Sequence, residues 1–141
     1  MGNPFCHIEL NTGDVAKAKA FYRRVFKWKL NTMKMGPGMP YTMIDVGKGV
    51  GGGMWKKPMR KQPTQWLPYV EVRSVAKSID AAKKAGAKIM VPFQPLPGMG
   101  AIGVFIDPTR GAIGIWQHER KTAKKRVKRA KKPVKRVAKR R

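Results

Sequence analysis

The side chains best suited to acid–base chemistry lie near the N-terminus, in a segment where polar and apolar residues alternate. His7 and Glu9 stand two positions apart and are separated by the apolar Ile8. Successive side chains of a β-strand point to opposite faces, so the imidazole and the carboxylate would share one face. An imidazole titrates near neutral pH, and His7 is therefore the candidate general acid or base.

Cys6 is the other reactive group of this segment. It directly precedes His7 and is expected to project to the opposite face of the strand, which disfavours a Cys–His nucleophile pair. A small buried thiol is the better interpretation. As the single cysteine of the chain, Cys6 also excludes an internal disulfide and fits a reducing compartment.

The elements that would position these residues come in two similar halves. Four short matches recur in the same order at offsets of 60 to 62 residues, and they are 15–17 with 75–77, 37–39 with 97–99, 44–45 with 106–107, and 53–55 with 114–116. A repeat of this kind indicates one structural unit used twice. Each unit is predicted to contain a strand, a helix and three further strands.

Alternation, helical spacing and capping residues place the individual elements. Asp14 and Ser74 are the expected N-caps of two helices, and Gly86 is the expected end of the second. Strands are expected at 5–11, 30–34, 41–46, 50–56, 66–72, 87–91, 100–106 and 112–117. The apolar stripe of the first helix is expected to consist of Val15, Ala18, Tyr22, Val25 and Phe26.

A β-α-β-β-β unit used twice, opened by His-x-x-Leu and closed by an Asp-Pro turn, resembles the vicinal oxygen chelate superfamily of glyoxalases, bleomycin-resistance proteins and extradiol dioxygenases. The branch that it most resembles is that of proteins related to lactoylglutathione lyase. The residues that carry the resemblance are His7–Asp14, Phe21-Tyr22, Phe26–Trp28, Trp66–Val72, Asp107-Pro108 and Ile113–Trp116. Lys27 and Arg110 stand where the family often has glycine, so backbone strain is expected if either position is left-handed.

The resemblance implies an α+β fold in which two tandem βαβββ modules form a curved mixed β-sheet. This sheet would be a cup with the helices on its outer face. The glyoxalase-like domain is expected at 1–119, with modules at 4–57 and 66–118 joined by a linker at 58–65.

For metal-dependent members, the resemblance implies four ligands from the first and last strands of each module. The corresponding positions are His7, Gly53, Leu67 and Gly114. Glycine and leucine side chains cannot coordinate a metal, so no metal is expected in the usual place, and no cofactor is the simplest expectation. The alternative is a displaced site of His7, Glu9 and Glu71 that would take Ni, Zn, Mn or Fe.

Strand parity extends the set of side chains that should face the cup. Together with His7 they are Glu9, Trp55, Tyr69, Glu71, Trp116 and His118. The indoles next to Gly53 and Gly114 leave space for a flat group, which predicts a pocket for a small aromatic or anionic molecule. Alternatively, the tryptophans fill the core, and His7 is a former ligand hydrogen-bonded to Glu9, Tyr69 or water.

Charge is distributed unevenly along the chain. The 141 residues include 32 Lys and Arg against 7 Asp and Glu, a formal net charge of +25. The basic tail, residues 120–141, holds 14 of these basic residues and no acidic one, so about +11 remains on the body. Such a tail is expected to be disordered alone and to bind nucleic-acid phosphates without reading sequence. The contacts are expected from Lys124, Lys125, Arg126, Lys128, Arg129, Lys131, Lys132, Lys135, Arg136, Lys139, Arg140 and Arg141.

Three functions stay open from the sequence. The first is metal-free binding of a small molecule in the cup, with the tail on nucleic acid. The second is a lyase or isomerase of the glyoxalase type that uses a displaced metal or His7 directly. The third is polyanion binding, with the body as a dimerising scaffold. A basic body counts against sequestration of a cationic, bleomycin-like drug.

The sequence also bears on location and assembly. No apolar run is long enough for a membrane span, and no signal-peptide pattern opens the chain. A cytoplasmic protein is therefore expected, with association to the nucleoid through the tail. The resemblance implies a homodimer, because cups of this family are often completed by a second subunit.

Overall fold

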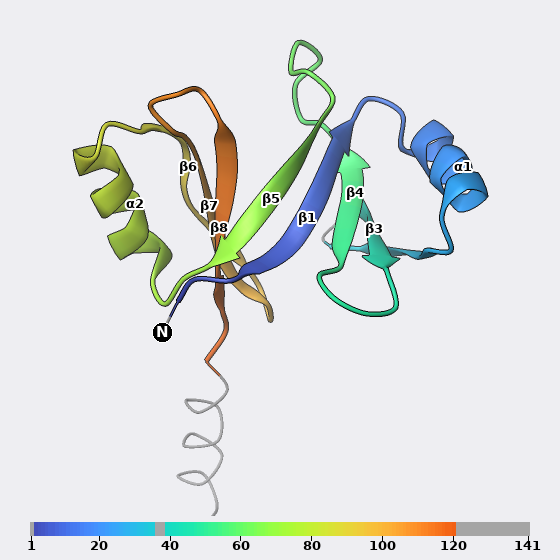
Figure 1. Ribbon diagram of the computed structural model, residues 1–141, viewed down its shortest axis with the longest axis horizontal. Helices are drawn as coiled ribbons and strands as arrows, with labels where there is room; N and C mark the ends of the chain where they lie inside the picture. Colours follow the sequence, from blue (N-terminus) through green and yellow to red (C-terminus); the bar gives the residue numbers. More distant parts are fainter. Residues whose placement is uncertain (1, 36–38, 121–141) are drawn as a thin grey trace, which may run out of the picture.

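The computed structural model describes residues 2–35 and 39–120, which form two β-α-β-β-β units in sequence (Figure 1). The first unit consists of β1 Phe5–Thr12, α1 Val15–Val25, β2 Lys29–Lys34, β3 Pro40–Asp45 and β4 Gly52–Lys56. The second consists of β5 Gln65–Glu71, α2 Val75–Lys84, β6 Lys88–Leu96, β7 Gly100–Ile106 and β8 Ala112–His118. Neither of these two helices has the length and apolar character needed to cross a bilayer. The basic tail from Lys121 onward and residues 36–38 of the repeat lie outside the described residues.

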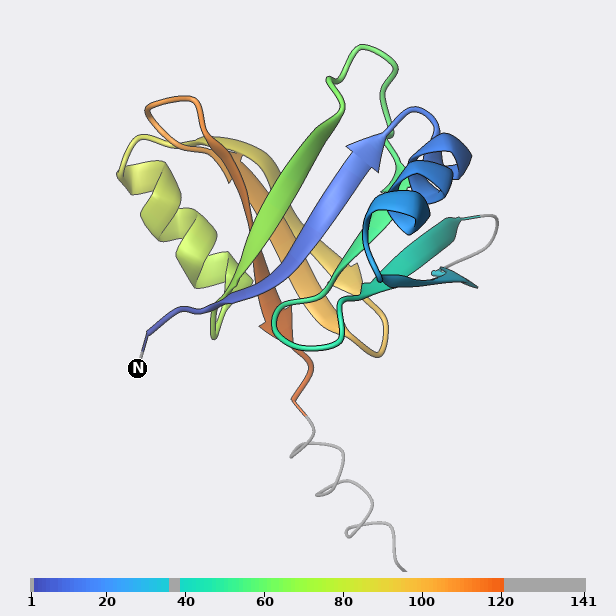
Figure 2. The same ribbon diagram turned by 45° about the vertical axis from the view of Figure 1, so that its right-hand side comes forward.

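All eight strands join one open, curved sheet in the order β2-β3-β4-β1-β5-β8-β7-β6. β1 and β5 pair antiparallel at its centre, where His7 lies opposite Tyr69 and Glu9 opposite Leu67. β1 pairs in parallel with β4, and β5 with β8, so the sheet is mixed. Figure 1 and Figure 2 show α1 and α2 at opposite flanks of this sheet. The α+β class and the curved mixed sheet expected from the sequence are confirmed.

Both helices begin where their capping residues predict. The Asp14 carboxylate accepts a hydrogen bond from Lys17 N at 3.0 Å, and the Ser74 hydroxyl accepts one from Lys77 N at 3.1 Å. Each bond satisfies one N–H group that has no partner within the first turn of the helix. Gly86 follows the end of α2 with a φ of +100°, a conformation that glycine adopts without strain.

Each helix covers an apolar cluster on the same side of the sheet. The cluster at α1 contains the buried strand residues Leu10, Ile44 and Met54. The cluster at α2 contains Val75 and Ile79 of the helix and Ala101 and Ile115 of the sheet. Side chains alternate along a strand, so Leu10 faces α1 whereas Glu9 points to the other side of the sheet. We call this other side, opposite the helices, the cup face.

Two expectations about the ends of elements are wrong. β6 continues to Leu96 through Pro92 and Pro95 instead of ending near residue 91. It is an edge strand, where a proline can lack its N–H without breaking a central ladder. Val25 and Phe26 are 51% and 45% exposed and lie outside the partly buried stripe of Val15, Ala18 and Tyr22, because α1 ends at Val25.

Left-handed backbone occurs at one of the two positions named from the sequence. Arg110 has a φ of +80° in the turn that its N–H closes onto the Asp107 oxygen. Among the non-glycine residues that the structure describes, Arg110 alone has a positive φ, so Lys27 carries no such strain. The chain leaves α1 through an extended Phe26 instead, with a φ of −122°.

Candidate functional site

A hydrogen-bonded network of four side chains occupies the centre of the cup face. His7 and Glu9 come from β1, Tyr41 from β3 and Tyr69 from β5. The distance from His7 Nε2 to the Tyr41 hydroxyl is 2.8 Å, and this hydroxyl donates to Glu9 Oε2 at 2.7 Å. The Tyr69 hydroxyl donates to Glu9 Oε1 at 3.2 Å. Each of the four residues is at most 9% exposed, so the network is shielded from water.

The positions of the protons in this network follow from the number of donors that each side chain has. A phenol carries one proton, and both tyrosines give theirs to Glu9, which accepts as a carboxylate. The Tyr41 oxygen must then accept its second hydrogen bond from His7. The imidazole therefore carries its proton on Nε2, and Nδ1 is the ring atom that can accept a further hydrogen bond.

Burial sets the acid–base behaviour of these groups. It lowers the pKa of His7 to about 4, so the imidazole is neutral at pH 7. Burial raises the pKa of Glu9, and hydrogen bonds from Tyr41 and Tyr69 oppose that rise. The pKa values of both tyrosines are raised by burial and then by the charge of Glu9. The phenols therefore remain donors across the physiological range, and the imidazolium form of His7, which would act as a general acid, is scarce at neutral pH.

Two tyrosine rings fill the space that ligand side chains on the closing strands would need. A Cβ atom on Gly53 would lie 2.2 Å from the Tyr41 hydroxyl, and one on Gly114 would lie 2.4 Å from the Tyr69 ring. Real Cβ atoms essentially never approach another atom within 3.0 Å, so neither is possible unless a ring moves. The glycines and tyrosines therefore fit together as complementary pairs.

Tyr41 is the site residue that sequence reasoning missed. Its hydroxyl takes the place beside His7 that was expected for another side chain or for water. It lies on β3, which β4 separates from β1, and its ring lies against Gly53 of that intervening strand. The equivalent position in the second unit is Ile102, because Gly103 pairs with Ile115 as Thr42 pairs with Met54, so the internal repeat gives no signal for Tyr41. The signal that could have found Tyr41 is the alternation of side chains along the strand expected at 41–46, which places Tyr41 on the face opposite Ile44.

The other residues expected on the cup face are spread along it. Trp116 lies beside the network, with its ring centroid 5.1 Å from that of His7. Trp55 is placed by a hydrogen bond from Nε1 to Asn11 Oδ1 at 2.5 Å. Glu71 and His118 lie 3.8 Å apart, with side chains 46% and 57% exposed. The structure thus brings Trp116 to His7 and leaves Glu71 and His118 at an exposed end of β5 and β8.

The three residues named for a displaced metal site do not converge. Both oxygens of Glu9 accept from phenols, His7 Nε2 is bonded to Tyr41, and Glu71 faces His118. Among the described residues, no group of three or more His, Cys, Asp or Glu side chains is placed to hold a metal ion. The residues present here therefore do not fit the metal that metal-dependent members of the fold family hold.

Comparison with known proteins identifies the family of the chain. The sequence profile of the Glyoxalase/Bleomycin resistance protein/Dioxygenase superfamily matches residues 5–113. The chain belongs to this superfamily. The resemblance found in the sequence is thereby confirmed, and the molecule is a glyoxalase-like protein whose usual ligand positions carry one histidine, one leucine and two glycines.

Two curated relatives are similar to this glyoxalase-like protein. Both are named Putative glyoxylase CFP32, one from Mycobacterium bovis and one from Mycobacterium tuberculosis. Each is 29% identical over 117 residues, which cover 80% of this chain and 45% of the relative. The chain therefore spans less than half the length of these relatives.

Solved structures share the fold at low sequence identity. The hypothetical protein BH1468 from Bacillus halodurans has a TM-score of 0.64 at 14% identity, covering 86% of this chain and 98% of its own. Methylmalonyl-CoA epimerase from Mycobacterium tuberculosis has a TM-score of 0.61 at 12% identity, covering 85% and 91%. A Streptomyces coelicolor methylmalonyl-CoA epimerase in complex with 2-nitronate-propionyl-CoA has a TM-score of 0.57 at 12% identity, covering 82% and 94%. These likenesses concern the fold alone.

Proposed function

We propose that this glyoxalase-like protein binds a small aromatic molecule against the cup face, without a metal in the usual place. The observation that carries the proposal is the packing of two tyrosine rings into the space of the closing-strand ligands. What remains for recognition is the network around Glu9 and the partly exposed indoles of Trp55 and Trp116. Indole faces favour flat apolar groups, which supports an aromatic ligand.

The charges on the cup face favour an aromatic ligand over an anionic one. Two carboxylates, those of Glu9 and Glu71, belong to the residues expected there, and none of these residues is a Lys or Arg. His7 is neutral at pH 7 because its pKa is about 4. Beside the network, an anion would meet the negative charge of Glu9, and no Lys or Arg among these residues offsets it.

His7 would position the ligand in this proposal. Its Nε2 is bonded to Tyr41, so Nδ1 is the acceptor that can meet a hydroxyl or N–H group on the ligand ring. Trp116 lies edge-on to the imidazole, at an interplanar angle of 61°, and would hold an aromatic ring near that atom. A lyase or isomerase with His7 as its general acid is less well supported. With a pKa of about 4, almost none of His7 is in the protonated imidazolium form at neutral pH.

Fluorescence titration with neutral phenols and indoles tests the ligand class. Trp116→Ala should weaken binding about twofold to tenfold or more, since an aromatic contact contributes about 0.5–1.5 kcal/mol beyond its buried area. Trp66→Ala is the matched control, because Trp66 packs with Tyr22 and Trp28 on the helix side of the sheet. Equal weakening by the two substitutions would contradict a ligand on the cup face.

Metal analysis of the purified protein tests the metal-free part of the proposal. We expect Ni, Zn, Mn and Fe well below one equivalent, and no rise in melting temperature when they are added. His7→Ala should leave the metal content unchanged. A stoichiometric metal that this substitution removes would refute the proposal.

We also propose that the basic tail binds nucleic acid through its phosphates. Its 14 basic residues without an acidic one support this, and the affinity should fall steeply with salt because counterions are released. A full-length variant with the twelve Lys and Arg of residues 124–141 changed to Gln should bind duplex DNA more weakly, with a shallower salt dependence. Identical binding of both proteins across a salt series would rule this role out. Sedimentation of the same proteins tests the homodimer that the family implies.

A further inference from the structure

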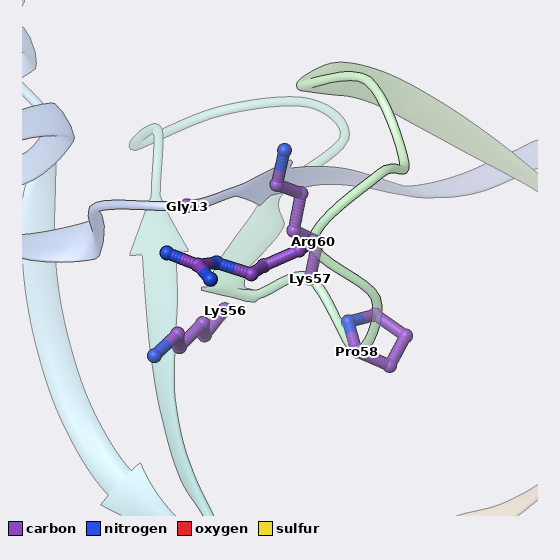
Figure 3. Close-up of a pocket in the computed structure, with 5 residues that line it drawn as sticks. All are labelled: Gly13, Lys56, Lys57, Pro58 and Arg60. Atoms are coloured by element: carbon purple, nitrogen blue, oxygen red, sulfur yellow. The ribbon is translucent and has the colours of Figure 1, made fainter.

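A basic pocket lies at the end of β4, apart from the network on the cup face (Figure 3). It has a volume of about 540 Å³ and is lined by Gly13, Lys56, Lys57, Pro58 and Arg60. Gly13 belongs to the connection from β1 to α1, and the other residues belong to the end of β4 and the segment that follows it. Figure 3 shows the side chains of Lys56 and Arg60 extending in the same direction, whereas Lys57 points elsewhere.

Hydrogen bonds fix the walls of this pocket. Lys57 N donates to the Thr12 oxygen at 3.0 Å, which ties the segment after β4 to the end of β1. Lys57 Nζ donates to the backbone oxygen of Gln62, and Gln62 N donates to the Met59 oxygen at 3.1 Å. The pocket is therefore built from a folded turn, and its shape does not depend only on long exposed side chains.

The positive charge in the pocket is not balanced by a carboxylate. No ion pair between described residues involves Lys56, Lys57 or Arg60. Asp14, which follows Gly13 in the sequence, is engaged as the N-cap of α1. Cations that share one hollow repel each other, so a bound anion would stabilise this arrangement.

We propose that the basic pocket binds the phosphate group of a small phosphorylated molecule. Lysine supplies a compact charge, and the guanidinium of Arg60 is a planar fork that can contact two phosphate oxygens. A doubly charged phosphate monoester gains more from the two cations of Lys56 and Arg60 than a carboxylate does. The volume of the pocket lies within the usual range for small-molecule sites and exceeds that of a phosphate, which leaves room for the organic part of the ligand.

The lining also indicates what the pocket would not select. Gly13 and Pro58 are the remaining lining residues, and neither offers a side-chain hydrogen-bonding group or an aromatic face. Recognition therefore rests on the phosphate, with little discrimination of the organic part. A hollow bounded by two chain segments suits a terminal phosphate better than a continuous phosphodiester backbone, which needs an open track.

NMR titration of the full-length protein with glycerol phosphate tests the proposal, with glycerol as the uncharged comparison. Glycerol phosphate should shift the amide signals of Gly13 and of residues 59–62 in a saturable way. Glycerol should leave the same signals unchanged. Duplex DNA is titrated in parallel, because its phosphates are the other source of the same chemistry.

Charge-removal variants locate the site. Lys56→Gln combined with Arg60→Gln should weaken the affinity for glycerol phosphate about tenfold or more, since charge-assisted hydrogen bonds are lost. The matched control, Lys48→Gln combined with Lys84→Gln, removes the same charge from two exposed positions elsewhere. It should change the affinity less than about twofold, as exposed charges interact weakly over distance in salt.

Three results would overturn the proposal. One is a set of shifts confined to residues 121–141. Another is an equal loss of affinity in the two double variants. The third is DNA that shifts the pocket amides while glycerol phosphate leaves them unchanged, which would assign the pocket to nucleic acid. None of these results bears on the ligand proposed for the cup face, because the two sites share no residue.

Discussion

Replacing Gly53 by alanine should destabilise this protein far more than the same substitution usually does. The new Cβ atom would lie 2.2 Å from the hydroxyl and from a ring carbon of Tyr41, whereas ordinary contact begins at 3.4 Å. The ring would therefore have to move by more than 1 Å. Inserting a carbon into a packed interior in this way costs about 1–3 kcal/mol.

Moving the Tyr41 ring would also disturb two buried hydrogen bonds. Its hydroxyl donates to Glu9 at 2.7 Å and lies 2.8 Å from His7 Nε2. A hydrogen bond to a charged group contributes about 1.5–3 kcal/mol, and a neutral one contributes about 1 kcal/mol. With the partial loss of both, we expect Gly53→Ala to lower the free energy of unfolding by about 3–5 kcal/mol. That is a large share of the stability of a domain of this size.

A double-mutant cycle with Tyr41→Ala isolates the clash. Without the ring, the cost of Gly53→Ala should fall to within about 1 kcal/mol, because the three atoms nearest to the added carbon all belong to the Tyr41 side chain. Urea unfolding followed by tryptophan fluorescence supplies the free energies. Gly13→Ala is the control, since a Cβ atom there would meet only the flexible end of Lys57 at 3.5 Å.

The reasoning is refuted if Gly53→Ala costs less than about 1 kcal/mol, or costs the same with and without the Tyr41 ring. If Tyr41→Ala unfolds the protein, the pair of Gly114 and Tyr69 provides the same test. A Cβ atom on Gly114 would lie 2.4 Å from the Tyr69 ring, so Gly114→Ala should show a similar cost and a similar coupling to Tyr69→Ala.

Three further predictions concern single groups. As the pH falls from 6.5 to 4, protonation of His7 should lower the free energy of unfolding by up to about 3 kcal/mol. The reason is that the pKa of His7 is 6.5 in the unfolded chain and about 4 in the folded protein. His7→Phe should lack this loss. The raised pKa of Glu9 acts in the opposite direction, but it does so in both proteins, so identical pH profiles of stability would contradict the lowered pKa of His7. Burial and the charge of Glu71 raise the pKa of the Cys6 thiol. Alkylation of Cys6 at pH 8 should therefore be slower in the folded protein than in the unfolded chain, and faster in Glu71→Gln than in the unchanged protein. Equal rates would contradict this prediction. Arg110→Gly should raise the free energy of unfolding by about 0.5–1 kcal/mol, because a φ of +80° strains an L-residue, and a less stable variant would count against that strain.

Local periodicity was enough to place the side chains of the two central strands. Alternation over 5–11 and 66–72 predicted that His7, Glu9 and Tyr69 share a face, and the structure brings them into one network. The same rule assigned the right face to Glu71, but parity says nothing about distance along a strand. Glu71 lies beyond the pair of His7 and Tyr69 and therefore stands at an exposed end of β5.

The order of strands in the sheet is what periodicity could not supply. Tyr41 reaches the network only because β3 lies next to β4, and because Gly53 of β4 has no side chain in its path. Both conditions depend on residues more than ten positions apart in the sequence. The length of β6 depends on the same information, since Pro92 and Pro95 are tolerated in a strand only at the edge of a sheet.

A metal site could be rebuilt in this cup only by paired changes. Gly53→Glu alone would drive its Cβ atom into Tyr41, and removing Tyr41 alone would leave the buried carboxylate of Glu9 without one of its two donors. Losing a hydrogen bond to a buried charged group costs about 1.5–3 kcal/mol, so each single step is destabilising. A cation would balance the negative charge of a metal site, whereas here two phenol hydroxyls stabilise the carboxylate of Glu9 by hydrogen bonds. The packing of the tyrosine rings therefore hinders a metal site in this cup as much as the missing ligands do.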